Sequence, residues 1–226
     1  MKNVYEDDEL VGTLTDGVVR RFGRILEFYF LADKAEDHVA ALLTLMNFPE
    51  GAVVLDAGCG VGEIARLMAT ARPDLRFILQ NISASQLDMC PPFMKLHGSF
   101  ENIPLPDASV DAIMFNYSLG HGDLWRCFAE ARRILRPGGI LSVYDLAAFD
   151  PAPMKRELGY TIHAVAAVAR AANWCQFVDD FTYVPNIKYA GNRLSLANPQ
   201  ERAAIEATFP IFYRFTKPNR FTKPRT

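Results

Sequence analysis

The chain has 226 residues, half of them hydrophobic, and a formal net charge of −2 at neutral pH. This length fits one α/β domain with ample material for a core. The balanced charge disfavours nucleic acid as a partner, because nucleic-acid-binding domains usually present a basic face. No apolar run reaches the length of a membrane span. The four cysteines lack CxxC or metal-ligand spacing, so we expect reduced cysteines, a cytoplasmic location and no metal site.

The first 48 residues are expected to form a helical cap segment. Residues 33–47 have helical periodicity, with Val39, Leu42, Leu43 and Met46 on one face. The aromatic and arginine residues before or beside this helix have two interpretations, a lid over a ligand site or ordinary packing and surface positions. They are Tyr5, Arg20, Arg21, Arg24, Phe28 and Tyr29.

Residues 53–63 combine a short apolar run, an acid and three glycines at alternate positions. The apolar run is typical of a buried parallel strand, and a helical pattern begins at Glu63. Glycine permits a sharp turn and close approach of a ligand to the main chain, and a helix N-terminus behind the turn offers free N–H groups. A turn without a ligand is less favourable, because each glycine inside an element costs about 1 kcal/mol. The stretch therefore predicts a nucleotide-type binding turn.

The order of the acid and the glycines separates two cofactor classes. A dinucleotide fingerprint has G-x-G-x-x-G with an acid about 20 residues later. Here Asp56 comes first, and Gly58, Gly60 and Gly62 follow as G-x-G-x-G. This resembles motif I of the class I S-adenosylmethionine (SAM)-dependent methyltransferases. The resemblance implies SAM as cofactor and S-adenosylhomocysteine (SAH) as product, and a nicotinamide oxidoreductase is disfavoured.

After a helix over residues 63–71, a second strand is expected at residues 75–79, and Ser83 is a good N-cap for a helix running to about residue 90. Members of the resembled family usually end this strand with an acid that binds the ribose hydroxyls. This chain has Asn81, whose amide can bond a hydroxyl without charge assistance. The run Asn81-Ile82-Ser83 with Gln86 is similar to that of the sterol, cyclopropane-fatty-acid and geranyl diphosphate C-methyltransferases. The resemblance implies that Asn81, Ile82 and Gln86 contact the cofactor.

A short third strand at residues 94–97 and a loop at residues 98–107 follow. The loop resembles the family segment that reads adenine, which implies an acceptor role for Ser99 and a backbone N–H contact from Phe100. A plain surface loop with proline turns is the alternative. A fourth strand at residues 110–116 ends at Asn116, at the sheet edge where open α/β folds bind ligands. We expect Asn116 near the methionine end of SAM.

The remaining pattern completes the fold. An amphipathic helix spans residues 122–135, and the turn at residues 136–139 resembles the family turn before a fifth strand at residues 140–146. A helical pattern at residues 154–175, strands at 177–184 and 209–216, and a helix at 199–208 follow. The resemblance implies a Rossmann-like α/β fold: a seven-stranded sheet with helices on both faces, strands six and seven antiparallel, and an N-terminal helical cap.

We expect a single methyltransferase domain over residues 1–226, with a cap (1–48), a cofactor-binding core (49–146), a substrate-side helix and last strands (147–216) and a tail (217–226). The cofactor-binding candidates lie in the glycine turn or at the ends of strands two to four. They are Asp56, Gly58, Cys59, Gly60, Gly62, Asn81, Ile82, Gln86, Ser99, Phe100 and Asn116.

Three residues are candidates for the chemistry. For an O- or N-acceptor, His121 is the best-placed base and Asp145 the second, although a lone histidine in a loop is more often solvated or structural. A C=C acceptor would pass through a carbocation. In the resembled geranyl diphosphate enzymes a glutamate stands beside that cation, where this chain has Tyr117, whose ring could stabilise it by cation–π attraction.

We therefore expect methyl transfer to a small, largely apolar acceptor, with the C=C of an isoprenoid or its diphosphate as the candidate. The acceptor pocket should be walled by the N-terminal segment and residues 147–175. An O- or N-methyltransferase of a natural-product or quinone-like acceptor, with His121 as base, stays open. So does a non-catalytic SAM-binding subunit, because Asn81 and Ser99 replace the carboxylates usual in the family. The expected partner is a small molecule, with no nucleic acid and no membrane span, and an oligomer stays open.

Overall fold

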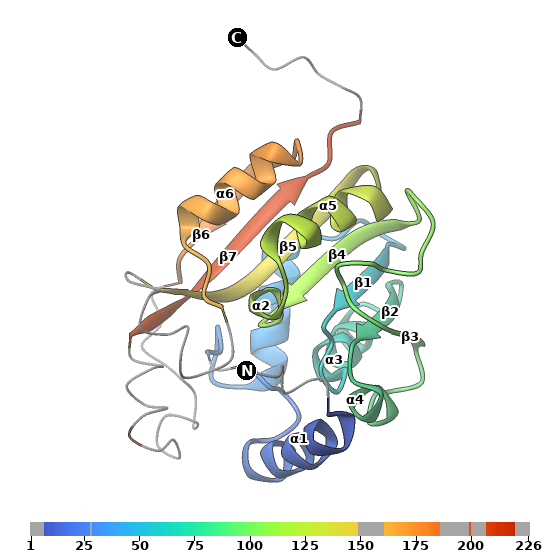
Figure 1. Cartoon of the computed structure of the whole chain (residues 1–226), viewed down its shortest axis with the longest axis vertical. Helices are drawn as coiled ribbons and strands as arrows, with labels where there is room; N and C mark the ends of the chain where they lie inside the picture. The colour runs from blue at the N-terminus through green and yellow to red at the C-terminus, as the bar shows by residue number, and fades with distance from the viewer. Residues whose placement is uncertain (1–6, 28, 149–160, 186–198, 200–206, 220–226) are drawn as a thin grey trace.

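The computed structural model describes residues 7–27, 29–148, 161–185, 199 and 207–219 (Figure 1). In this part of the chain the strands form one seven-stranded sheet in the order β3-β2-β1-β4-β5-β7-β6. The strands are β1 Val53–Ala57, β2 Arg76–Asn81, β3 Met94–His97, β4 Val110–Asn116, β5 Leu135–Ala148, β6 Val178–Tyr183 and β7 Thr208–Thr216. The predicted seven-stranded Rossmann-like sheet is thereby confirmed.

Strand direction follows from the pairing. Strands β1 to β5 pair in parallel with one another, and β7 is antiparallel to both β5 and β6. The last two strands are therefore antiparallel to each other, as predicted, but β7 alone runs against the rest of the sheet. Strands β1, β2 and β4 end at neighbouring points of one edge, because parallel neighbours share their direction. That edge carries the site described below.

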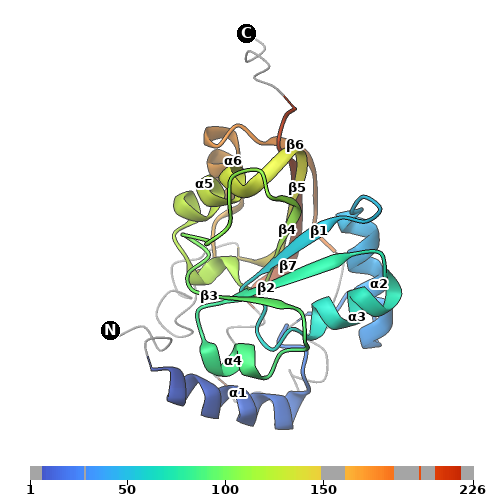
Figure 2. The same cartoon turned by 90° about the vertical axis from the view of Figure 1, so that its right-hand side faces the viewer.

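Helices cover both faces of the sheet (Figure 2). They are α1 Asp8–Phe22, α2 Ala35–Met46, α3 Glu63–Ala71, α4 Ala84–Asp88, α5 Leu124–Ile134 and α6 Val165–Trp174, with a 3₁₀ turn, η2, at Leu119–His121. One apolar core lies under α5 and α6, where Phe128 is fully buried. The other lies under α2 and α3, where Leu42 and Met68 are fully buried. Helices α2, α3, α5 and α6 thus each bury one apolar stripe, the arrangement expected of a doubly covered sheet.

Helix α1 belongs to the predicted N-terminal helical cap, although the sequence analysis found helical periodicity only for residues 33–47. Asp7 caps its start by accepting from Leu10 N at 3.1 Å, and the helix ends at Gly23, which has a φ of 83°. Its first residue, Asp8, holds α4: the Asp8 carboxylate accepts from Ser83 Oγ at 2.7 Å and from Ser85 Oγ at 2.8 Å. The N-terminal cap is therefore anchored on the helix that follows β2.

The predicted turn at residues 136–139 lies inside a strand. The β4–β5 register moves from Val110 opposite Leu135 to Ala112 opposite Ile140, so residues 136–139 form a bulge. Strand β5 consequently begins five residues before the predicted start. Gly138, with a φ of 79°, donates its N–H to Lys217 O at 2.7 Å, which ties the bulge to the chain after β7.

Two predicted helices lie partly or largely outside the described residues. Of the pattern at residues 154–175, the structure shows α6, and residues 154–160 are outside. Of residues 199–208, the segment 200–206 is outside. No helix in the described ranges combines the length and the apolar character that a bilayer crossing requires.

Candidate active site

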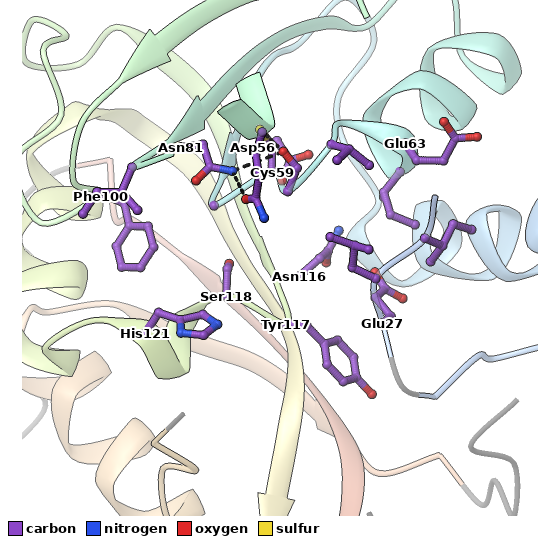
Figure 3. A pocket seen from close by; sticks show the side chains of 18 of the residues that line it. Glu27, Asp56, Cys59, Glu63, Asn81, Phe100, Asn116, Tyr117, Ser118 and His121 are labelled. Carbon is purple, nitrogen blue, oxygen red and sulfur yellow. Dashed lines mark hydrogen bonds between the residues drawn. The ribbon is translucent and has the colours of Figure 1, made fainter. Parts of the chain in front are cut away.

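A cavity of about 340 Å³ lies where β1, β2 and β4 end (Figure 3). Strands β1 and β4 are adjacent although β2 and β3 lie between them in sequence, and ligands of open α/β sheets bind at such switch points. Its volume is at the lower end of the range of about 300–1,000 Å³ found for ligand pockets. Every predicted cofactor residue except Gly62 lines this cavity, as do Tyr117 and His121. Asp145 does not line it.

Gly58 and Gly62 are required for different reasons. Gly58 has a φ of 75°, and a Cβ there would lie 2.6 Å from Ser118 Cβ, so the turn passes directly against the loop after β4. Gly62 has a φ of 71°, and a Cβ there would lie 2.8 Å from Pro91 Cδ. The structure therefore places Gly62 in the packing behind the turn, away from the cavity.

Backbone hydrogen bonds fix the glycine turn. Gly58 N and Cys59 N both donate to Gln80 O, at 2.9 and 3.0 Å. Ser118 Oγ donates to Ala57 O at 2.6 Å from the other side. The turn is thus held between β2 and the loop after β4.

Asp56 supplies a buried carboxyl to the cavity. It is 2% exposed. Burial raises the pKa of Asp56 well above its usual value, and the nearby Cys90 and Glu27 add smaller contributions in the same direction. A cationic group in the cavity would favour the ionised form of this carboxyl.

The amide of Asn81 is already engaged. Asn81 Nδ2 donates to Gly60 O at 3.1 Å and to Gln86 Oε1 at 2.8 Å, which uses both of its hydrogens. Asn81 Oδ1 accepts from Ser83 N at 3.1 Å and keeps one lone pair. A ribose hydroxyl could therefore donate to Asn81 Oδ1 but could not accept from its nitrogen.

The loop after β3 contributes Ser99 and Phe100 to the cavity, as predicted. Phe100 is buried, and its ring packs edge-on against Phe115 with centroids 5.4 Å apart. Ser99 Oγ accepts from Glu101 N at 3.1 Å, so it also retains one lone pair. Both residues lie on the cavity wall, and Figure 3 shows Phe100 across the cavity from Asn116.

The segment before α2 covers the glycine turn. Four consecutive residues, 24–27, line the cavity. Leu26 Cδ1 lies 3.0 Å from where a Cβ on Gly60 would be. Arg24 Nη2 donates to Val61 O at 3.2 Å and to Met89 O at 2.8 Å, and Arg24 Nε pairs with Glu63 Oε2 at 3.1 Å. Of the residues with two interpretations, Arg24 therefore lies over the turn.

The other members of that set lie elsewhere. Tyr29 is buried, and its hydroxyl donates to Thr208 O at 3.0 Å, which is a packing position. Arg20 and Arg21 belong to α1, and neither lines the cavity. Tyr5 and Phe28 are outside the described residues.

Tyr117 stands at the end of β4 in a left-handed conformation, with a φ of 52°. Its hydroxyl accepts from Tyr29 N at 3.1 Å, and its ring packs edge-on against Tyr144 at 5.4 Å. Burial, followed by the nearby Tyr144 and Glu27, raises the pKa of Tyr117 well above its usual value. The phenol therefore stays neutral, and its ring is fixed at the cavity.

His121 and Asp145 differ in placement. Desolvation by the surrounding protein lowers the pKa of His121 to about 4, although the residue as a whole is exposed. The imidazole is thus neutral at physiological pH. Asp145 lines a separate small hollow with His163 and Tyr213, and its Oδ1 accepts from Leu146 N at 2.7 Å.

Several cavity residues were missed from the sequence. Ser118 and Val61 stood next to motif residues, which was the available signal. The segment 24–27 carries no sequence motif, and only Arg24 of this segment was considered in the sequence analysis. The unassigned lining residues are Ile25, Leu26, Glu27, Val61, Glu63, Ile64, Ser118 and Leu146.

The structure also shows where the cysteines and other possible metal ligands lie. Cys59 lines the cavity, and its Sγ lies 3.9 Å from Cys90 Sγ; all four thiols are free. Within the described ranges no group of three or more His, Cys, Asp or Glu side chains is arranged to hold a metal.

Comparison with known proteins finds a family that matches the central part of the chain. The methyltransferase domain family matches residues 55–143, from β1 into β5. Malonyl-(acyl-carrier protein) O-methyltransferase of Pectobacterium atrosepticum is 33% identical over 136 residues, which cover 58% of this chain and 53% of that protein. Sterol 24-C-methyltransferase of Schizosaccharomyces pombe is 26% identical over 172 residues, covering 70% and 46%. The chain thus spans about half the length of these relatives.

Solved structures share the fold. Geranyl diphosphate C-methyltransferase from Streptomyces coelicolor A3(2), in complex with Mg²⁺, geranyl-S-thiolodiphosphate and SAH, has a TM-score of 0.75 at 16% identity, covering 93% of this chain and 97% of that one. The cyclase SpnF has a TM-score of 0.77 at 16% identity over the same shares. The described residues therefore share the fold of these structures, and residues 55–143, which include the acid-first glycine turn, match the methyltransferase domain family.

Proposed function

We propose that this protein transfers the methyl group of SAM to a small, largely apolar acceptor. The observation that carries the proposal is the cavity itself, which combines the glycine turn with a mainly apolar wall at the switch point of the sheet. Apolar lining with a few placed polar groups is typical of small-molecule sites. We propose further that residues 1–226 act as one methyltransferase domain with the four parts given above.

The residues present fit SAM. Gly58 and Gly60 line the cavity, a buried carboxyl is present at Asp56, and Asn116 Oδ1 is a buried acceptor without a partner in the described part of the chain. Asn81, Ile82, Gln86, Ser99 and Phe100 would hold the adenosine end. When bound, SAM supplies an electrophilic methyl group. The protein's own tasks are to orient the acceptor, exclude water and accept a proton.

An isoprenoid double bond is the acceptor that we favour. The pattern of Asn81-Ile82-Ser83 with Gln86 supports it, and two of the proteins found above are named as C-methyltransferases of geranyl diphosphate and of a sterol. Alkene carbon would bond to the methyl carbon as the C–S bond breaks, leaving a cation on the neighbouring carbon. The fixed ring of Tyr117 would stabilise that cation, with ~2 kcal/mol available when the pair is desolvated. Loss of a proton to neutral His121 would complete the reaction.

A second candidate is an O- or N-acceptor with His121 as general base. The observation in its favour is that His121 is neutral and lines the cavity. One relative, described above, is named as an O-methyltransferase. Another is named as a dimethylglycine N-methyltransferase, from Parasynechococcus marenigrum; it is 33% identical over 138 residues, which cover 55% of this chain and 48% of that protein. A pKa near 4 makes His121 a weak base, since general bases work best with a pKa near the operating pH.

Methyl-labelled SAM, offered with a panel of prenyl, phenolic and amine acceptors, tests the proposal. Label transfer to a prenyl compound, with SAH formed in equal amount, is the expected result. Transfer only to a phenol or an amine would select the second candidate. Binding of SAM without turnover on any acceptor would favour a non-catalytic subunit, for which the internally bonded Asn81 and Ser99 are the supporting observations.

A further inference from the structure

Glu27 is a buried carboxyl on the cavity wall that no motif assigns. It is 2% exposed and lies in the segment that covers the glycine turn. One oxygen, Oε2, lies 2.5 Å from His38 Nε2. The other, Oε1, is buried and has no hydrogen-bond partner among the residues that the structure describes. Such an acceptor is costly unless something satisfies it.

His38 holds Glu27 in one orientation. Leu31 N donates to His38 Nδ1 at 2.9 Å, so Nδ1 is an acceptor and the hydrogen is on Nε2, which donates to Glu27. The His38 ring is fully buried and stacks on Phe30 with centroids 4.9 Å apart. The bond to His38 therefore uses one carboxyl oxygen and leaves the other available to a further partner.

Asn116 presents a second acceptor to the same cavity. Its Oδ1 is likewise buried and unpartnered within the described ranges, while its Nδ2 points to Met114 Sδ at 3.7 Å. Glu27 contributes, after burial, to the raised pKa values of both Asp56 and Tyr117, so its carboxyl lies within electrostatic range of the ends of β1 and β4. Figure 3 shows Glu27 and Asn116 on the side of the cavity away from Phe100 and His121.

We propose that Glu27 Oε1, with Asn116 Oδ1, receives the α-ammonium group of the methionine part of SAM. This inference rests on the proposed function. The sulfonium centre has no hydrogen to donate, whereas an ammonium has three and can satisfy both unpartnered acceptors. The location agrees, because Leu26 and Arg24 of the same segment lie against the glycine turn, which would take the methionine end. The N-terminal segment thereby supplies a charge-assisted contact from outside motif I.

Calorimetric titration with two ligands tests this assignment. One is SAH, and the other is the SAH analogue in which hydrogen replaces the α-amino group. Wild-type protein should bind SAH more tightly than the analogue. In Glu27→Gln the SAH affinity should fall by about tenfold to a hundredfold, the range for a hydrogen bond to a charged group. The analogue affinity should change little, so the ratio of the two dissociation constants should shrink.

Glu36→Gln is the matched control, because it removes the same charge from the exposed first turn of α2 and does not line the cavity. Its ratio should equal that of the wild type. An unchanged ratio in Glu27→Gln, whether both affinities fall or neither does, overturns the assignment; unchanged binding with slower methyl transfer would place Glu27 at the acceptor. If Glu27→Gln does not fold, Asn116→Leu carries the same test with the same expected loss of discrimination. Wild-type protein that binds neither ligand would refute the SAM function itself.

Discussion

Asn81 Nδ2 donates to Gln86 Oε1 over 2.8 Å at the carboxyl end of β2. Gln86 Nε2 in turn donates to Thr15 Oγ1 over 2.7 Å. A chain of side-chain hydrogen bonds therefore joins the cavity to α1. Helix α1 also contacts the start of α4 through Asp8, which accepts from two serines there. The position that the family normally uses for the ribose is here also a brace for the N-terminal cap.

Replacing Asn81 by alanine should weaken SAH binding by about 0.5–1.5 kcal/mol, the net worth of a neutral hydrogen bond. The remaining lone pair of Asn81 Oδ1 is the group expected to accept from the ribose. Titration calorimetry measures the change. Thr15→Val cuts the next bond of the chain but lies outside the cavity, so it should affect binding less. An unchanged dissociation constant in Asn81→Ala would show that the amide serves only as a brace.

Gly60→Val should abolish SAH binding, and Gly51→Val should not. Both glycines have a positive φ, 55° and 68°, so both valines carry backbone strain on the order of 1–2 kcal/mol. A Cβ on Gly51 meets nothing within 4 Å, whereas one on Gly60 lies 3.0 Å from Leu26 Cδ1. A side chain at Gly60 would therefore displace the covering segment 24–27, which lines the cavity. Denaturation curves and SAH titrations of both variants check this, and equal binding losses would contradict it.

Tyr117→Phe should keep most methyl transfer, whereas Tyr117→Ala should lose it, if the ring face stabilises the cation. The phenylalanine variant removes the hydrogen bond that Tyr29 N donates to Tyr117, which should lower the free energy of unfolding by about 0.5–1.5 kcal/mol. Turnover and chemical denaturation measure the two effects separately. If both variants are inactive and His121→Ala is inactive too, proton transfer to an O- or N-acceptor explains the data better, and the isoprenoid proposal fails.

His121 should make stability depend on pH in a defined window. Its pKa is lowered from 6.5 to about 4, so between these values the unfolded chain binds more protons than the folded one. The free energy of unfolding from this group is therefore fully present above pH 6.5 and declines as the pH falls toward 4. His121→Gln should remove that part of the slope. A histidine titration near 6.5 in the folded protein, measured by NMR, would contradict the prediction.

The sequence predicted best what is encoded locally. The apolar runs predicted the strands of the sheet, and residues within the glycine motif or at strand ends proved to line the cavity. Gly62 was placed in the cavity because its spacing matches a motif, but its role is to let Pro91 and Leu79 pack behind the turn. A motif fixes the backbone path and does not show which side of it each glycine serves.

Features that depend on distant contacts were missed or predicted only in outline. Helix α1 leaves Leu10 and Leu14 about half exposed, so it lacks a strong buried stripe, and polar bonds to α4 hold it in place. Glu27 has no motif around it, and its meaning comes from His38 and from the end of β4, which only the fold brings together. The bulge inside β5 likewise depends on Lys217, nearly 80 residues further along the chain.

Calorimetric titration of the folded protein with SAM and with SAH, with NAD⁺ as the matched negative ligand, tests the central claim most directly. We expect saturable binding of both SAM and SAH at one site per chain and no binding of NAD⁺, because the glycine turn has the acid-first spacing and the second strand ends in an amide. Gly60→Val should remove the signal. Absence of heat with SAM and SAH in protein shown to be folded, or binding of NAD⁺ in their place, would contradict the account.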